Sequence, residues 1–210
     1  MAKMKNGILD GLNGKIGPVV AYQWKGRDCV RSYETTYRDP RTPKQQSCRQ
    51  IFSVASRLAA DMRAAVNIGF RGMAAVNQTT ERGCFMRVNK QCFYMENNGV
   101  SIDYTTVKVA QGLLPAIVFS EPQLCEQGTV RVAFHTESGG KSTDYVLLFA
   151  YAPGTGIGRL SLPAARYQNV VSITLPRFWA GHEVHFYGFA WDCDSTTSDS
   201  VHIGTINLPQ

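Results

Sequence analysis

Residues 145–152 read Tyr-Val-Leu-Leu-Phe-Ala-Tyr-Ala, the longest apolar run in the chain. The run is much shorter than the roughly 20 residues that a helix needs to cross a bilayer. It lies between the turn-forming pairs Gly139-Gly140 and Pro153-Gly154, so it predicts a short strand buried in a protein core. We expect neither a membrane span nor a signal peptide.

Similar short segments follow one another from about residue 100 onward. They are rich in β-branched and aromatic residues, and glycine and proline turns separate them. The expected strands are 101–109, 116–119, 129–135, 145–151, 170–175, 183–191 and 201–208. Such a series of short strands, with no helical pattern between them, predicts an antiparallel β-sandwich of immunoglobulin or fibronectin III type.

A helical pattern precedes these strands. Thr42 is followed by Pro43 and then by Gln45, which predicts an N-cap with a capping box and a helix over 43–67. Apolar residues recur at helical spacing through this range. A second helix is expected over 76–94.

The first 33 residues predict extended structure. Residues 16–33 predict a β-hairpin that turns at Lys25-Gly26-Arg27. Residues 1–15 contain several glycine and asparagine breakers and predict an arm. Because a lone hairpin is marginally stable in water, we expect it to pack on the rest of the protein or on another copy.

The expected fold class is therefore α+β, with an arm, a β-hairpin and helices over 1–98 and an antiparallel β-sandwich over 99–210. Charge supports this division. Residues 1–90 hold 16 Lys and Arg against 6 Asp and Glu, a net +10, whereas residues 91–210 hold 6 against 10, a net −4. The opposite signs favour head-to-tail attraction between copies, although helices can simply carry more surface charge than a sandwich does.

Four motif-like segments are explained better by structure than by chemistry. Residues 139–142 lack the first glycine and the following helix of a phosphate-binding loop, and 154–158 lack the spacing of a dinucleotide fingerprint. His182 and His185 lie on an expected strand and point to opposite faces. The acidic residues of 192–199 lack calcium-loop spacing. We therefore predict no catalytic residue, no metal site and no cofactor, and expect that the protein is not an enzyme.

The cysteines form no Cys-x-x-Cys pair, which in a reducing compartment predicts free and largely buried thiols. They are Cys29, Cys48, Cys84, Cys92, Cys125 and Cys193. We expect the protein to be cytoplasmic, or part of a virion if a phage encodes it.

A basic and aromatic cluster near the N-terminus is the strongest candidate binding site. Arginines neutralise phosphates and aromatic rings stack on bases, so this composition is typical of a single-stranded nucleic-acid surface. The same residue types are enriched at protein interfaces, and composition alone does not separate the two. The expected binding residues are Trp24, Lys25, Arg27, Arg31, Arg38 and Arg41.

Several motifs, spread over both halves of the chain, resemble one family. They are Lys5-Asn6-Gly7-Ile8, Gly14-Lys15-Ile16-Gly17, Trp24-Lys25-Gly26 with Arg31-Ser32, Pro40-Arg41-Thr42 with Gln45, and Trp179-Ala180-Gly181-His182-Glu183-Val184-His185. The chain resembles an uncharacterised family of Bacteroidota proteins, catalogued as a domain of unknown function (DUF6266). It departs from the family at four cysteines, Cys29, Cys48, Cys84 and Cys92. The resemblance implies a bacterium or one of its phages as the source and assigns no catalytic residue.

The expected function is that of a non-enzymatic assembly protein. Arms rich in turn residues are commonly ordered by a neighbouring subunit, and a β arm can add to the sheet edge of another copy. The protein would then self-associate through its N-terminal arm as a subunit of a virion, a filament or another large complex. The alternative is a nucleic-acid-binding protein that uses its basic, aromatic N-terminal half.

Overall fold

The computed structural model describes residues 2–3, 12–36, 39–97, 99–125, 128–136 and 139–209. The fold is α+β, as predicted, with helices and antiparallel sheets. The chain divides into two compact units, 1–45 and 46–210. The predicted boundary between residues 98 and 99 falls inside the second unit, where helices and strands share one core.

The first unit holds a four-stranded antiparallel sheet in the order β1-β4-β3-β2. Its strands are β1 (Ala2–Lys3), β2 (Gly14–Ile16), β3 (Val19–Trp24) and β4 (Arg27–Ser32). The predicted hairpin corresponds to β3 and β4. Lys25 and Gly26 join them with φ of 46° and 73°, as expected for a two-residue turn that matches the strand twist. Two described parts of the predicted arm form β1 and β2, and residues 4–11 lie outside the described residues.

The first predicted helix begins where expected. Thr42 Oγ1 accepts a hydrogen bond from the Gln45 amide, and Gln45 Oε1 accepts one from the Thr42 amide, both at 3.3 Å. The helix does not continue to residue 67, because it breaks at Met62 (φ −89°, ψ 11°). The Met62 side chain is fully buried, so packing of the next turn on the core takes precedence over a straight helix. The helices are α1 (Pro43–Asp61), α2 (Arg63–Gly69), α3 (Arg71–Val76), α4 (Glu81–Val88) and the short 3-10 helix η1 (Lys90–Cys92).

The second predicted helix, over 76–94, is wrong at both ends. Helix α4 begins only after Thr80, whose Oγ1 accepts a hydrogen bond from the Gly83 amide at 3.0 Å. At the other end, β5 (Phe93–Glu96) pairs with β6 (Gly99–Ile102) in an antiparallel hairpin. This pairing, together with the buried ring of Phe93, outweighs a weak local helical preference.

Two larger antiparallel sheets occupy the second unit. One has the order β11-β10-β14-β15 with β12 beside β10, and the other has the order β13-β9-β7 with β8 beside β9. Six of the seven predicted strands are present with nearly the expected bounds. The strands are β7 (Ile117–Phe119), β8 (Gln123–Leu124), β9 (Thr129–Thr136), β10 (Tyr145–Ala152), β11 (Ile157–Leu160), β12 (Ala164–Ala165), β13 (Val170–Thr174), β14 (Glu183–Trp191) and β15 (Val201–Asn207).

The predicted strand 101–109 is present only at its start, in β6. Asp103 ends it with a turn, because its carboxylate accepts hydrogen bonds from the Thr105 amide (3.0 Å) and from the hydroxyl of Thr106 (3.0 Å). The chain then runs to residue 112 without regular structure.

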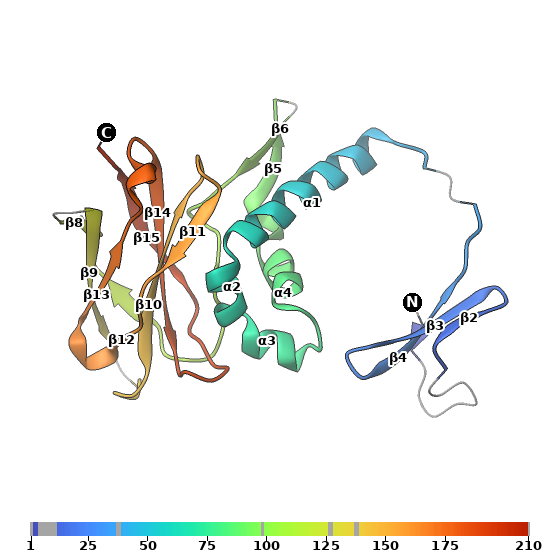
Figure 1. Cartoon of the computed structure of the whole chain (residues 1–210), viewed down its shortest axis with the longest axis horizontal. Coiled ribbons are helices and arrows are strands. Elements are labelled where there is room, and N and C mark those ends of the chain that lie inside the picture. The colour runs from blue at the N-terminus through green and yellow to red at the C-terminus, as the bar shows by residue number, and fades with distance from the viewer. Residues whose placement is uncertain are drawn as a thin grey trace. The chain divides into compact units, whose positions relative to one another are not determined.

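Strand β10 is buried on both faces. Leu147, Phe149 and Tyr151 belong to an apolar cluster that includes the helices, whereas Val146 and Leu148 belong to a second cluster shared with the sheet β13-β9-β7. The helices therefore lie on one side of the sheet β11-β10-β14-β15 and the smaller sheet lies on the other (Figure 1). This arrangement explains why residues 145–152 are apolar throughout instead of alternating. Within the described residues, no helix is long and apolar enough to cross a membrane.

Candidate functional site

The register of the N-terminal sheet sorts its side chains onto two faces. Directly paired residues of antiparallel strands point to the same side, and neighbours along a strand point to opposite sides. Val20 pairs with Lys15 and with Arg31, and Trp24 pairs with Arg27. These residues, with the others in register, form what we call the basic face: Lys15, Val20, Tyr22, Trp24, Arg27, Cys29, Arg31 and Tyr33.

The opposite side of the sheet is called the apolar face. It consists of Ile16, Val19, Ala21, Gln23, Asp28, Val30 and Ser32. Two contacts agree with this assignment. Gln23 Nε2 donates a hydrogen bond to Asp28 Oδ1 at 3.5 Å on the apolar face, and Lys15 Nζ lies 3.7 Å from the ring centre of Tyr33 on the basic face.

Neither face has a core beneath it. Among the described residues of the first unit, only Ala21 and Cys29 are buried apolar residues. Large apolar side chains stay exposed on both faces: Ile16 and Val19 are 49% and 37% exposed, and Trp24 is 47% exposed. A sheet in a stable domain normally packs at least one face against another layer. Both faces of this sheet therefore leave large apolar side chains exposed.

The structure brings three of the six predicted binding residues together. Trp24, Arg27 and Arg31 share the basic face, and Lys25 lies in the turn at its end. Arg41 lies outside the sheet, where its Nε is 3.7 Å from Asp39 Oδ2. The remaining predicted residue, Arg38, is outside the described residues.

Lys15 joins this site although the sequence did not single it out as a binding residue. It reaches the face because β2 pairs with β3, which places Lys15 opposite Val20. A local signal existed, since Gly17-Pro18 is a turn pair between two β-prone segments. A register between β2 and β3 was still needed to assign Lys15 to one face.

A second cluster, in the second unit, combines aromatic rings with titratable groups. The Tyr151 hydroxyl donates a hydrogen bond to Asp61 Oδ2 at 3.3 Å. The ring of Tyr104 lies 5.9 Å from that of Tyr151 and stacks on His185 at 4.7 Å. His185 Nδ1 lies 3.3 Å from His202 Nε2, so only one of the two nitrogens donates. Asp61, Tyr104 and Tyr151 line a cleft of about 490 Å³ beside the turn between β10 and β11.

Burial governs the protonation of this cluster. It raises the pKa of Asp61, against the lowering effects of the Tyr151 hydrogen bond and of the Arg57 charge. It also raises the pKa of Tyr104, to which the negative charge of Asp61 adds. Burial lowers the pKa of His185 and of His202, so both imidazoles are neutral at pH 7.

The loops that resemble phosphate-binding motifs have structural roles. Gly140 lies against the guanidinium of Arg166, so close that a Cβ there would be 1.8 Å from an Nη atom. Arg166 Nε forms a buried ion pair with Asp144 Oδ2 at 3.4 Å, and its Nη1 donates to Thr136 Oγ1 at 3.2 Å. Residues 153–156 form the turn between β10 and β11. Neither loop precedes a helix that could bind a phosphate.

The histidines and acidic residues are also accounted for. His185 is buried and His182 is half-buried. Asp192 Oδ1 accepts hydrogen bonds from the amides of Asp194 and Thr196 at 2.9 and 3.0 Å, which shapes the acidic loop. Across the part of the chain that the structure describes, no group of three or more His, Cys, Asp or Glu side chains is placed to hold a metal ion.

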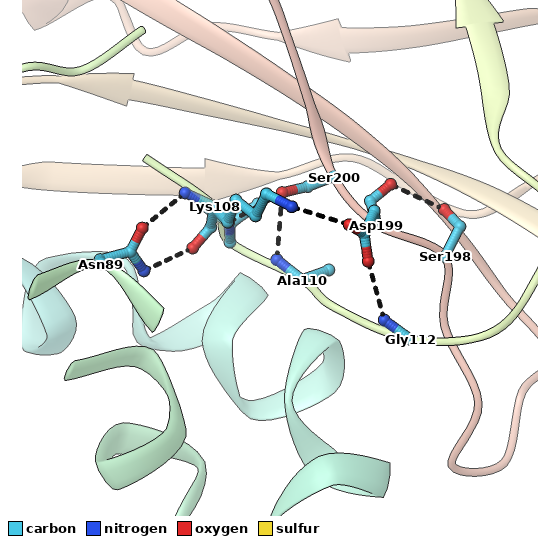
Figure 2. A network of polar contacts seen from close by, with 8 residues as sticks. Asn89, Lys108, Ala110, Gly112, Ser198, Asp199 and Ser200 are labelled. Atoms are coloured by element: carbon cyan, nitrogen blue, oxygen red, sulfur yellow. Dashed lines mark hydrogen bonds and ion pairs between the residues drawn. The ribbon is translucent and has the colours of Figure 1, made fainter. Parts of the chain in front are cut away.

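A polar network links the irregular segment 107–112 to Asn89, directly after α4, and to Ser200, directly before β15 (Figure 2). Asn89 Oδ1 accepts a hydrogen bond from the Lys108 amide at 2.7 Å, and its Nδ2 donates to the Lys108 carbonyl at 2.9 Å. On the other side, Ser200 Oγ accepts from the amides of Val109 (2.9 Å) and Ala110 (3.2 Å). Because these bonds satisfy buried backbone groups, the network holds the fold together and needs no ligand to explain it.

A family model described as a family of unknown function (DUF6266) matches residues 11–204. The chain belongs to this family. The match confirms the resemblance inferred from the sequence motifs. A search of curated proteins finds no match to the chain.

The DUF6266 match covers both units. It includes β2, β3 and β4 of the first unit, and in the second unit it extends into β15. The basic face, the apolar face and the cluster around Tyr104 therefore all lie within the matched range.

Proposed function

We propose that this DUF6266 protein is a non-enzymatic assembly subunit that self-associates through its N-terminal sheet. The observation that carries the proposal is the near absence of a core in that sheet, where Ala21 and Cys29 are the buried apolar residues among those described. A sheet normally buries its apolar face against a second layer. A second copy of the chain supplies that layer in our proposal.

Charge selects the face that pairs. The basic face holds Lys15, Arg27 and Arg31, so two basic faces would repel each other. The apolar face has Asp28 as its one charged side chain among the residues described, and Gln23 donates a hydrogen bond to it. Two copies can therefore pack apolar face on apolar face around a two-fold axis, an isologous contact.

Side-chain size suits such a contact. Ile16 and Val19 lie opposite each other on neighbouring strands. Val30 lies two residues before Ser32, which pairs with Val19, so Val30 is on the same face. In a face-to-face pair these side chains would meet their counterparts, as in the packed sheets of a sandwich. Burial of each exposed apolar side chain adds to the stability of the pair.

For the second unit we propose a sandwich of immunoglobulin or fibronectin III type. The support is the strand order. The strands β10, β14 and β15 lie side by side in the order of strands C, F and G of that fold. The strands β13, β9 and β7 lie in the order of its strands E, B and A. The apolar cluster shared by the two sheets supplies the core that such a sandwich requires. In the assembly that we propose, a virion, a filament or another large complex, the N-terminal sheets join the chains in pairs, and a second contact elsewhere on the chain joins the pairs.

Two neighbouring residues provide a matched test. Val19→Asp places a charge on the apolar face, and Val20→Asp places the same charge on the basic face, between Lys15 and Arg31. We expect light scattering of the full chain at tens of micromolar to show an oligomer for the wild type and for Val20→Asp, and a monomer for Val19→Asp. Circular dichroism checks that both variants remain folded.

A wild-type protein that stays monomeric at tens of micromolar would refute the proposal. Equal loss of assembly in both folded variants would show that the apolar face is not the contact.

A further inference from the structure

We infer that the basic face of the N-terminal sheet binds single-stranded nucleic acid, with Trp24 and Tyr33 stacking on bases and with Lys15, Arg27 and Arg31 contacting phosphates. This inference goes beyond the proposed assembly, because it concerns the opposite side of the sheet. It requires no pairing of the apolar faces.

The arrangement along the strands is the first support. The Tyr33 amide donates a hydrogen bond to the Pro18 carbonyl at 2.7 Å, which places Tyr33 level with Pro18 at one end of β3. Trp24 lies at the other end of the same strand. Six residues separate the two levels, or about 20 Å at roughly 3.3 Å per residue. The two exposed aromatic rings thus mark the ends of one linear track.

Cations lie along this track. Lys15 and Arg31 flank Val20 in the row next to Tyr33, and Arg27 pairs with Trp24 at the far end. Lys15 Nζ lies over one face of the Tyr33 ring, 3.7 Å from its centre, so a base would stack on the other face of that ring. Alternating rings and cations match a strand whose bases and phosphates both need partners.

The distribution of charge is the second support. Residues 1–45 hold nine Lys and Arg against four Asp and Glu, a net +5 out of the +6 of the whole chain. Within the sheet the signs are segregated, since Asp28 lies on the apolar face and the three cations of the described strands β2 to β4 lie on the basic face. A concentration of like charge on one side of a sheet attracts a polyanion.

The exposed aromatic rings indicate that the polyanion is a single strand and not a duplex. Trp24 is 47% and Tyr33 is 40% exposed, and each offers a flat surface beside a cation. In a duplex the bases are stacked in the interior, out of reach of rings on a sheet, whereas a single strand can splay its bases onto aromatic side chains. Aromatic and basic residues are also enriched at protein interfaces, so binding of an acidic protein without binding of oligothymidylate would overturn the inference.

Fluorescence anisotropy with the full chain tests the inference. The probes are labelled oligothymidylate, oligouridylate of the same length, and a duplex of that length. We expect both single strands to bind more tightly than the duplex. With three phosphates neutralised, affinity for a single strand should fall with a log–log salt slope of about −2, or roughly 20-fold between 50 and 200 mM salt.

Two kinds of variant separate the two chemistries. Arg31→Gln should weaken binding and make the salt slope shallower by about 0.7, because one phosphate contact is lost. Trp24→Ala should weaken binding about tenfold and leave the slope unchanged, because stacking is not ionic. Lys44→Gln, which removes a cation of the same unit outside the sheet, is the matched control and should leave binding unchanged.

The inference is refuted by an absence of binding at 50 mM salt, by a duplex that binds as tightly as the single strands, or by equal effects of Arg31→Gln and Lys44→Gln. The variants of the assembly test keep the two proposals apart. Val19→Asp should still bind oligothymidylate although it no longer assembles, and Val20→Asp should assemble but bind weakly. A Val19→Asp protein that is folded but does not bind would contradict the separation of the two faces.

Discussion

Replacement of Asn89 tests whether a single side chain fixes the irregular segment 107–112 to the helices. Asn89 is 1% exposed, and its amide group holds both backbone groups of Lys108, at 2.7 Å and 2.9 Å. The same Nδ2 also donates to the Phe85 carbonyl at 3.0 Å. No strand pairing supports this stretch of chain, so the side chain substitutes for a β-ladder (Figure 2).

Asn89→Ala leaves the Lys108 N–H and C=O groups without these partners. A buried backbone group that loses its partner costs about 1–3 kcal/mol, so the two groups together cost about 2–6 kcal/mol. This is a large part of the roughly 5–15 kcal/mol by which a domain is stable. At a typical urea m value of about 3 kcal/mol/M, a loss of about 3 kcal/mol lowers the unfolding midpoint by about 1 M.

Urea unfolding followed by circular dichroism measures this change, and Lys108→Ala is the matched control. That variant keeps the backbone bonds to Asn89 and removes only the ion pair between Lys108 Nζ and Asp199 Oδ2, which is 2.7 Å long and lies between side chains that are 40% and 44% exposed. Exposed pairs contribute about 0–1 kcal/mol. If Lys108→Ala destabilises the protein as much as Asn89→Ala does, or if Asn89→Ala costs less than about 1 kcal/mol, the reasoning is refuted.

Two further predictions concern buried charges in the second unit. Because burial lowers the pKa of His185 and His202 below the unfolded value of about 6.5, protonation favours the unfolded state. Unfolding free energy measured by urea titration should therefore be lost as pH falls below about 6.5, and a His185→Phe variant that lost just as much would contradict the assignment. Arg166→Met should lower the unfolding free energy by about 3–5 kcal/mol, because it leaves the buried Asp144 carboxylate without its counter-charge. Arg166→Met combined with Asp144→Leu should lower it less. Thermal unfolding compares the two variants, and additive losses would rule out the coupling of the two residues.

Local signals in the sequence were sufficient for several elements. The start of α1 follows from Thr42 and Gln45, which satisfy each other's backbone amides without help from the rest of the protein. The hairpin of β3 and β4 follows from Lys25-Gly26, because a turn of two residues with positive φ fixes the pairing on either side. The apolar run 145–152 indicated a buried strand, because it has only eight residues and lies between glycine and proline turns, which favours a strand over a buried helix.

Other features depended on contacts between distant residues. The break at Met62 and the strand β5 occur where packing against the core outweighs local helical preference. The residues next to these positions in the sequence do not predict that outcome. The cluster of Asp61, Tyr104 and His185 unites α1, an irregular segment and β14, which only the packed fold brings within reach.

The candidate site shows the same division. Its composition was visible in the sequence, because basic and aromatic residues are concentrated between Lys15 and Arg41. Which of them act together was decided by strand register, which shifts every side chain to the other face when it slips by one residue. Pairing of β2, β3 and β4 placed Lys15, Trp24 and Arg31 on one side, and Ile16 and Val19 on the other. The sequence alone therefore determined which residue types were available, and tertiary structure divided them into two surfaces, because register depends on all paired strands at once.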